Sequence, residues 1–74
     1  MDENDVAKVL YRLAQRERVQ AFGRDHGRLL TFDLKEVFPE LSKETIIKIW
    51  RAHFPHIPID DVTRNVLVIH FDGE

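Results

Sequence analysis

The segment TFDLKEVFPELSKETIIKIWRAHF, residues 31–54, decides the fold predicted from this sequence, because it carries two successive helix-start signals. Asp33 with Glu36 three residues later has the spacing of a capping box, and Ser42 is a second N-cap candidate. Pro39 lies between the two signals, where a first helix should end and the chain should turn. The segment therefore predicts a short helix, a tight turn and a longer helix.

The two predicted helices, residues 34–38 and 43–54, each have one apolar face. In the longer helix the apolar residues recur at intervals of three and four, which is the spacing of a buried helical stripe. Trp50 lies on that stripe and is expected to anchor the core. The predicted inner face comprises Leu34, Val37, Phe38, Leu41, Ile46, Ile49, Trp50 and Phe54.

Residues 4–22 are predicted to form the first helix, with Gly23 as its terminator. Its apolar stripe changes phase, because Val19 follows Leu10 by nine residues, a rotation of about 180° on a helix. One interpretation is a helix covered by core on two sides or broken near Glu17. The functional alternative is a dimer or partner surface, and it uses Tyr11, Val19 and Phe22.

The strands are expected in two parts of the chain. GRDHG, residues 23–27, is predicted to be a loop, and RLLTF, residues 28–32, a short strand. Residues 56–59 and 65–71 are predicted to form a second pair of strands around a turn at 60–64. The last of these strands, NVLVIHF, is rich in β-branched residues, which favours a strand.

The composition narrows the class of protein. A chain of 74 residues with 43% hydrophobic residues is predicted to be one globular domain, residues 1–74. The absence of cysteine excludes disulfides, thiolate zinc sites and cysteine nucleophiles, and it fits a cytoplasmic protein. No apolar run approaches the roughly 18 residues that span a bilayer, so no membrane partner is expected.

Charge is distributed unevenly, although the net charge is only −2. Residues 42–54 carry three basic residues and one acidic residue, whereas residues 55–74 carry one basic and four acidic residues. Residues 12–28 contain five arginines, opposed by Glu17 and Asp25. These arginines either form local ion pairs on a solvated surface or follow a polyanion backbone.

No pattern of residues supports catalysis. His53 and His56 are separated by Pro55 and lack a neighbouring thiolate, so no metal site is predicted. Ser42 is the only serine and is already assigned to a helix cap, and no glycine-rich phosphate loop is present. We therefore expect no enzyme activity, no cofactor and no small-molecule substrate.

The predicted order of elements is helix, strand, helix, turn, helix, strand, strand, and it resembles that of the winged helix-turn-helix family. In this resemblance residues 28–32 match the short first strand, residues 33–54 the helix-turn-helix, and residues 56–71 the hairpin called the wing. The resemblance covers nearly the whole chain but rests on no diagnostic motif. It implies an α+β fold with three helices, a short strand and a C-terminal β-hairpin wing.

The resemblance also implies duplex DNA as the partner, bound in the major groove by the helix at 43–54. A small regulator of transcription or of phage or plasmid functions is the expected protein. The residues of that helix expected at DNA are Ser42, Lys43, Glu44, Thr45, Ile47, Lys48 and Arg51. Arg24 and Arg28 from the basic region are expected to contribute phosphate contacts.

The predicted wing departs from the family, because Asp60 and Asp61 would repel a phosphate backbone. The alternative function is therefore a protein–protein interaction module, such as an inhibitor or an assembly subunit, that does not bind DNA. A protein partner or a homodimer would then contact Tyr11, Val19, Phe22, Asp60 and Asp61.

Overall fold

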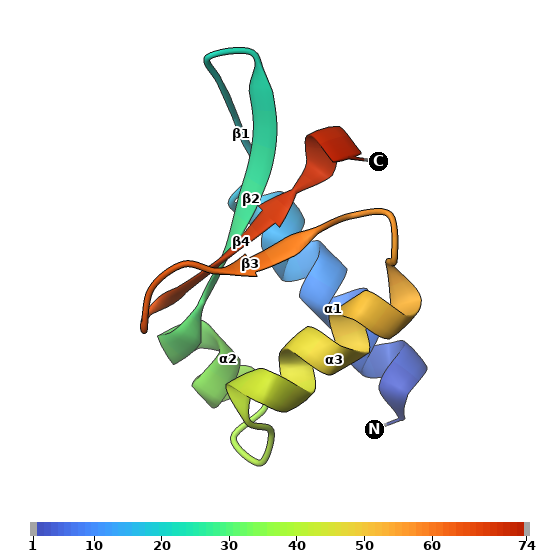
Figure 1. Ribbon diagram of the computed structural model, residues 1–74. Coiled ribbons are helices and arrows are strands. Elements are labelled where there is room, and N and C mark those ends of the chain that lie inside the picture. Colours follow the sequence, from blue (N-terminus) through green and yellow to red (C-terminus); the bar gives the residue numbers. More distant parts are fainter. Residues whose placement is uncertain (1, 74) are drawn as a thin grey trace.

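Three helices lie against a four-stranded antiparallel sheet in the computed structural model, which describes residues 2–73 (Figure 1). The strand order across the sheet is β1-β2-β4-β3. The chain order is α1 (Glu3–Arg16), β1 (Val19–Ala21), β2 (Arg24–Leu30), α2 (Thr31–Val37), α3 (Lys43–His53), β3 (Ile59–Asp61), β4 (Val66–His70) and a 3-10 turn η1 (Phe71–Gly73).

The α+β class is as expected, but the winged helix-turn-helix arrangement is wrong. The structure has a four-stranded antiparallel sheet where one short strand and a separate hairpin were expected. Along the chain, β1 and β2 come between α1 and α2. These two strands pair with each other, and β2 also pairs with β4. The fold is a small compact α+β domain of a different arrangement.

The first helix is shorter than predicted, because it ends at Arg16 with Glu17 as its C-cap. The break near Glu17, one of the two interpretations of the phase change, is therefore correct. Phe22 and Gly23 both have positive φ angles, 54° and 74°, as in the type I′ turn that suits a tight hairpin. Ala21 pairs with Arg24 across this turn, so residues predicted as helix and loop form strands.

The two helix starts in the segment 31–54 behave differently. Ser42 caps α3 as predicted, because its Oγ accepts a hydrogen bond from the Thr45 N–H at 3.2 Å. Asp33 does not cap α2, which begins at Thr31 without a side-chain cap. Instead, the Thr31 N–H donates to the carbonyl of Asn65 at 2.9 Å, so the segment before β4 satisfies this helix start.

The predicted C-terminal strands are both present but shifted. The earlier one begins at Ile59 rather than at residue 56, and the later one spans Val66–His70. Pro58 lacks an N–H group, so it cannot donate to a strand neighbour, although its carbonyl accepts from the His70 N–H at 2.9 Å. Proline therefore delays the start of β3.

Trp50 is the centre of the hydrophobic core, as predicted. Its side chain is completely buried, and its indole Nε1 donates to the carbonyl of Ile57 at 2.7 Å. Most of the predicted inner face is buried or packed against the core, but Val37 is 44% exposed and was predicted wrongly. The fully buried side chains largest in volume are Trp50, Phe71, Leu10, Leu29, Ile46, Leu67 and Ile69.

Membrane-spanning helices are absent from residues 2–73, because none of the helices there combines the necessary length with sufficient apolar character. Helix α1, the longest in this range, has 14 residues.

Candidate interaction surfaces

The β1–β2 hairpin projects beyond the rest of the molecule, at the top of Figure 1. Its tip residue Phe22 is fully exposed, with a relative accessibility of 104%. Phe22 has a positive φ angle, a backbone conformation that favours glycine, asparagine or aspartate over a bulky aromatic residue. Phe22 therefore presents an exposed aromatic ring at the end of a two-stranded hairpin.

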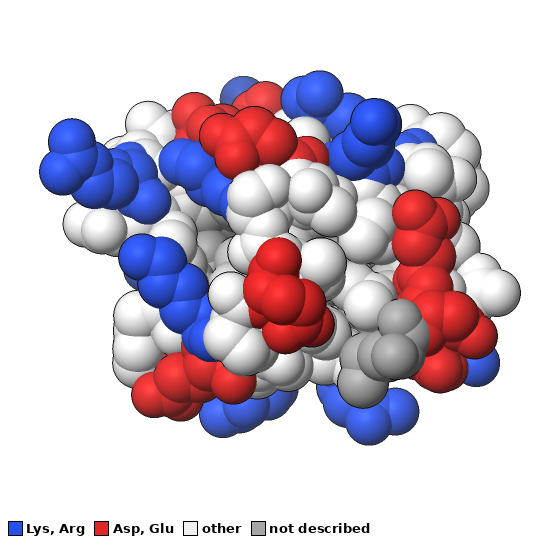
Figure 2. Space-filling view, turned by 90° about the horizontal axis from the view of Figure 1, so that it is seen from below, with Lys and Arg blue, Asp and Glu red and all other residues white. Residues whose placement is uncertain are grey.

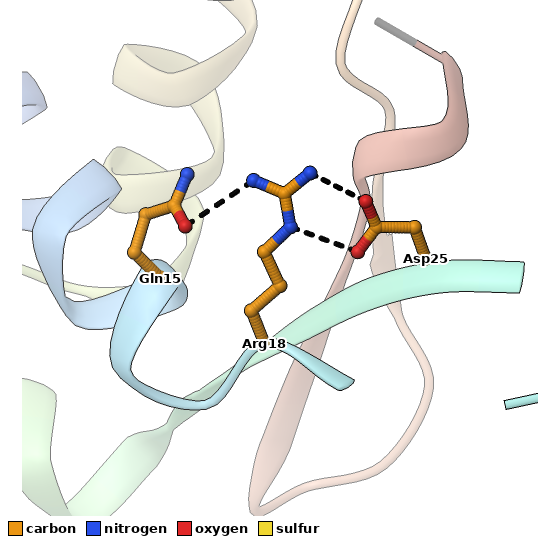
Figure 3. A network of polar contacts seen from close by, with 3 residues as sticks. All are labelled: Gln15, Arg18 and Asp25. Atoms are coloured by element: carbon orange, nitrogen blue, oxygen red, sulfur yellow. Dashed lines mark hydrogen bonds and ion pairs between the residues drawn. The ribbon is translucent and has the colours of Figure 1, made fainter. Parts of the chain in front are cut away.

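The base of the hairpin is held by Arg18, which follows α1 and precedes β1 (Figure 3). Its Nε donates to Oδ1 of Asp25 at 2.8 Å, and a second guanidinium nitrogen bonds the other carboxylate oxygen. A third nitrogen, Nη1, donates to Oε1 of Gln15 at 3.2 Å. The guanidinium also lies 4.4 Å from the centre of the Phe71 ring. Arg18 thereby connects the end of α1, β2 and η1.

The contacts of Arg18 affect the ionisation of the Asp25 carboxyl group. The hydrogen bonds from Arg18 lower the pKa of Asp25 below its ordinary value, because they favour the charged carboxylate. Asp25 is consequently an ion-pair partner throughout the neutral range. Arg18 and Asp25 therefore neutralise each other, and the bond from Arg18 to Gln15 holds this end of the hairpin against α1.

The predicted protein-interface residues lie at three separate places. Tyr11 packs among core aromatic rings, with ring centres 5.4 Å from Phe54 and 5.8 Å from Phe71, so it supports the core. Val19 is 41% exposed and lies with Phe22 on the hairpin. The two aspartates predicted as interface residues, Asp60 and Asp61, lie on β3 at the other edge of the sheet.

The outer face of α3 carries most of the residues predicted to bind DNA. Ser42 is engaged as the cap, and Lys43 Nζ donates to Oδ1 of Asp61 at 2.9 Å. The side chains of Lys48 and Arg51 are exposed. A shallow hollow of about 420 Å³ on this face is lined by Glu44, Thr45, Ile47, Lys48 and Arg51. The helix therefore keeps a polar, partly cationic surface, but its first cation is neutralised by β3.

The other two residues predicted at DNA, Arg24 and Arg28, belong to β2. Arg24 is next to the hairpin turn, whereas Arg28 is 3.6 Å from a carboxylate oxygen of Glu17. The hairpin tip, next to Arg24, points away from α2 and the α2–α3 connection (Figure 1), so Arg24 lies apart from the cations of α3. Arg28 lies toward the other end of β2, which leads into α2. Figure 2 shows Lys and Arg interspersed with Asp and Glu on the face viewed from below.

Two of the histidines lie next to carboxylate groups. Within residues 2–73 no group of three His, Asp or Glu side chains is arranged to hold a metal ion. His53 Nε2 is 3.6 Å from Oε2 of Glu3, and His70 Nε2 is 2.7 Å from Oδ2 of Asp60. These histidines have carboxylate neighbours in pairs, not in the convergent sets that metal ligands require.

Sequence reasoning missed the hairpin that presents Phe22, although it named Val19 and Phe22 as surface residues. The signal available was the phase change of the apolar stripe at Glu17, followed by a bulky residue and a glycine. It also missed the exposed apolar side chains Phe32 and Val62, which are 64% and 61% exposed.

The fold and these surfaces define a small α+β domain with a projecting, aromatic-tipped hairpin. Comparison with protein-family models, curated proteins and solved structures finds no match to this chain. Functional inference therefore rests on its own residues and their arrangement.

Proposed function

We propose that this protein is a protein-interaction module that binds its partner through the β1–β2 hairpin. The observation that carries the proposal is Phe22, a fully exposed aromatic side chain at a positive φ angle. Exposure of a large apolar surface and a left-handed backbone both cost free energy in the isolated molecule. Burial of the ring against a partner offsets the first of these costs.

The charges of the hairpin favour a protein over a nucleic acid. Arg18 is paired with Asp25, and Arg28 has Glu17 as a neighbour. Among residues 18–26, Arg24 is the cation with no ion pair to the described part of the chain. One such cation gives little attraction to a polyphosphate, whereas one aromatic anchor with a flanking arginine is a frequent centre of protein interfaces.

The experiment is affinity capture with three forms of the protein: wild type, Phe22→Ala and Phe32→Ala. Phe32 is the matched control, because it is also an exposed phenylalanine but lies on α2. A stoichiometric partner should bind wild type and Phe32→Ala equally, and Phe22→Ala roughly 30-fold more weakly, as expected for loss of an aromatic hot spot. A partner that binds Phe22→Ala as tightly as wild type would contradict the proposal.

Duplex DNA is the second candidate partner, and the observation that favours it is the outer face of α3. Lys48 and Arg51 are exposed there beside Thr45, and no ion pair joins either cation to another residue of 2–73. Such a face can contact phosphates, with Thr45 and Ile47 near base edges.

A gel-shift assay on random duplex DNA at two salt concentrations tests this candidate. Lys48→Glu with Arg51→Glu should abolish salt-dependent binding, and Lys8→Glu with Lys35→Glu is the control of equal net charge on α1 and α2. Equal binding by both double variants would remove α3 as the DNA contact. Under both proposals, we propose that the protein acts in the cytoplasm, as predicted from the sequence.

A further inference from the structure

The sheet has one face in the core and one face that the helices leave open. Along β4, Leu67 and Ile69 are buried, whereas the alternate residues Val66 and Val68 keep accessible surface. Along β2, Leu29 is buried and its neighbours are at least partly accessible. Since side chains alternate between the two faces of a strand, the accessible set shares one face. Its members on β2, β4 and β3 are Arg24, His26, Arg28, Leu30, Val66, Val68, His70 and Asp60.

One row across this open face has an ordered charge pattern. Arg28 of β2 is opposite Val68 of β4, and Val68 is opposite Asp60 of β3. The row therefore runs from basic through apolar to acidic over three adjacent strands. In the next row Leu30 is opposite Val66, which adds two apolar side chains.

This row is complementary to itself. Consider a second copy of the chain related to the first by a rotation of 180° about an axis that is parallel to β4 and lies just above the open face. The row of the second copy then lies over the row of the first and runs across the strands in the opposite direction. Val68 then faces Val68 of the second copy, and Arg28 faces Asp60 of the second copy. The same operation repeats the Arg28–Asp60 contact on the other side of the axis, so the interface is isologous and closed.

From this pattern we propose that the open face of the sheet binds a second copy of the chain, forming a two-fold symmetric dimer with aligned sheets. Charge complementarity selects a second copy as the occupant. The present neighbours of the two charges do not prevent the contact, because the Arg28–Glu17 and His70–Asp60 pairs are solvent-exposed and such pairs contribute little.

The dimer is expected to be weak. The two-fold axis brings three strands, β2, β4 and β3, against their copies, whereas β1 lies beyond them. Three strands about 4.8 Å apart and roughly five residues long give a face on the order of 200 Å² in projection, which is below the size of most specific protein interfaces. The dissociation constant should therefore lie in the micromolar range or above. The hairpin tips lie outside this face, so a dimer would present two copies of Phe22 to partners.

The first test is sedimentation equilibrium of the whole chain from about 1 μM to 1 mM. Arg28→Asp and Asp60→Arg should each weaken the dimer roughly 10-fold, because like charges then face each other. The combined Arg28→Asp and Asp60→Arg variant should return to within about threefold of wild type, since the pairs are restored with exchanged signs. Arg64→Asp, in the exposed loop before β4, is the charge-matched control.

The second test locates the surface by a dilution series with methyl NMR spectra. The methyl signals of Leu30, Val66 and Val68 should shift with concentration, whereas those of Val37 and Ile47, on the helices, should not. A monomer over the whole concentration range would overturn the inference, as would a combined variant no better than the single ones. Phe22→Ala should leave the dimer unchanged, so failure of the hairpin proposal and failure of this one are separate results.

Discussion

Phe22 occupies a backbone conformation that a phenylalanine side chain makes costly. Its φ angle of 54° places Cβ against the backbone carbonyl, a contact that glycine avoids and that asparagine tolerates. The exposed ring regains nothing in the isolated protein, because it makes no contact with the core. At this residue stability and binding should therefore oppose each other.

Replacement of Phe22 by asparagine should stabilise the isolated domain by about 0.5–1 kcal/mol. The reason is that Asn-Gly is the preferred sequence for a turn in which both central residues have positive φ. Urea unfolding followed by circular dichroism measures the change. Gly23→Ala is the opposite control, because its φ of 74° should make alanine lose about 1 kcal/mol. A Phe22→Asn variant less stable than wild type would show that the ring stabilises the hairpin.

Asp25 should make the stability of the domain depend on pH. Its pKa is lowered in the folded state by the hydrogen bonds from Arg18, so the ion pair contributes fully at pH 7. That contribution is lost as the pH falls below the ordinary aspartate value of about 3.9 and through the lower folded-state pKa. Wild type should therefore be more stable than Asp25→Asn at neutral pH, and the difference should shrink on acidification. Urea midpoints of both forms between about pH 7 and pH 3 test this, and a constant difference would contradict it.

The elements that could be predicted from the sequence are those with local signals. Helix α3 was predicted to within one residue, because Ser42 caps it and its apolar stripe is regular. Strand β1 has three residues and pairs only with β2, so its stability comes from a partner that no local pattern reveals. The start of α2 was wrong for the same reason, since Asn65, far along the chain, supplies its hydrogen-bond acceptor.

The candidate surfaces were predictable to a similar degree. The exposure of Lys48 and Arg51 followed from helical spacing. The pairing of Lys43 with Asp61 did not, because the two residues are 18 positions apart and meet only when β3 packs beside α3. Ion pairs between residues far apart in the sequence also decide which charged side chains are available to a partner. The number of basic residues in 42–54 therefore overestimated how basic the surface of α3 is.

The close packing of α1 on β2 depends on Gly27. A Cβ atom at this position would lie 2.6 Å from the Ala14 carbonyl oxygen and 2.7 Å from Cε2 of Phe71. Gly27→Ala should therefore lower the free energy of unfolding by about 1–3 kcal/mol, because either α1 or η1 must move away from the sheet. Thermal unfolding should show a midpoint lower by roughly 4–8 °C per kcal/mol in a domain of this size. An unchanged midpoint would contradict this prediction, because it would mean that α1 or η1 can move away from the sheet without loss of stability.

At the scale of the whole molecule, the hairpin is the part with the least support from the core. Its β1 strand contributes no buried side chain, whereas Leu67 and Ile69 in the centre of the sheet are fully buried. The connection of β1 to the body depends on its pairing with β2 and on the contacts of Arg18. We infer that the hairpin can open while the sheet centre and the helices stay folded.

Native-state hydrogen exchange measures this difference. Amides of β4 should exchange only through global unfolding, and hydrogen-bonded amides of β1 should exchange at least roughly 100-fold faster, through local opening. Arg18→Ala should widen the gap, because it removes the bonds to Asp25 and Gln15 and the contact with Phe71, which connect the hairpin to the rest of the domain. Equal protection of β1 and β4 would place the hairpin in the same cooperative unit as the core. A locally opening hairpin would instead mean that a bound partner stabilises β1 as well as burying Phe22, and that part of the binding energy is used to order the strand.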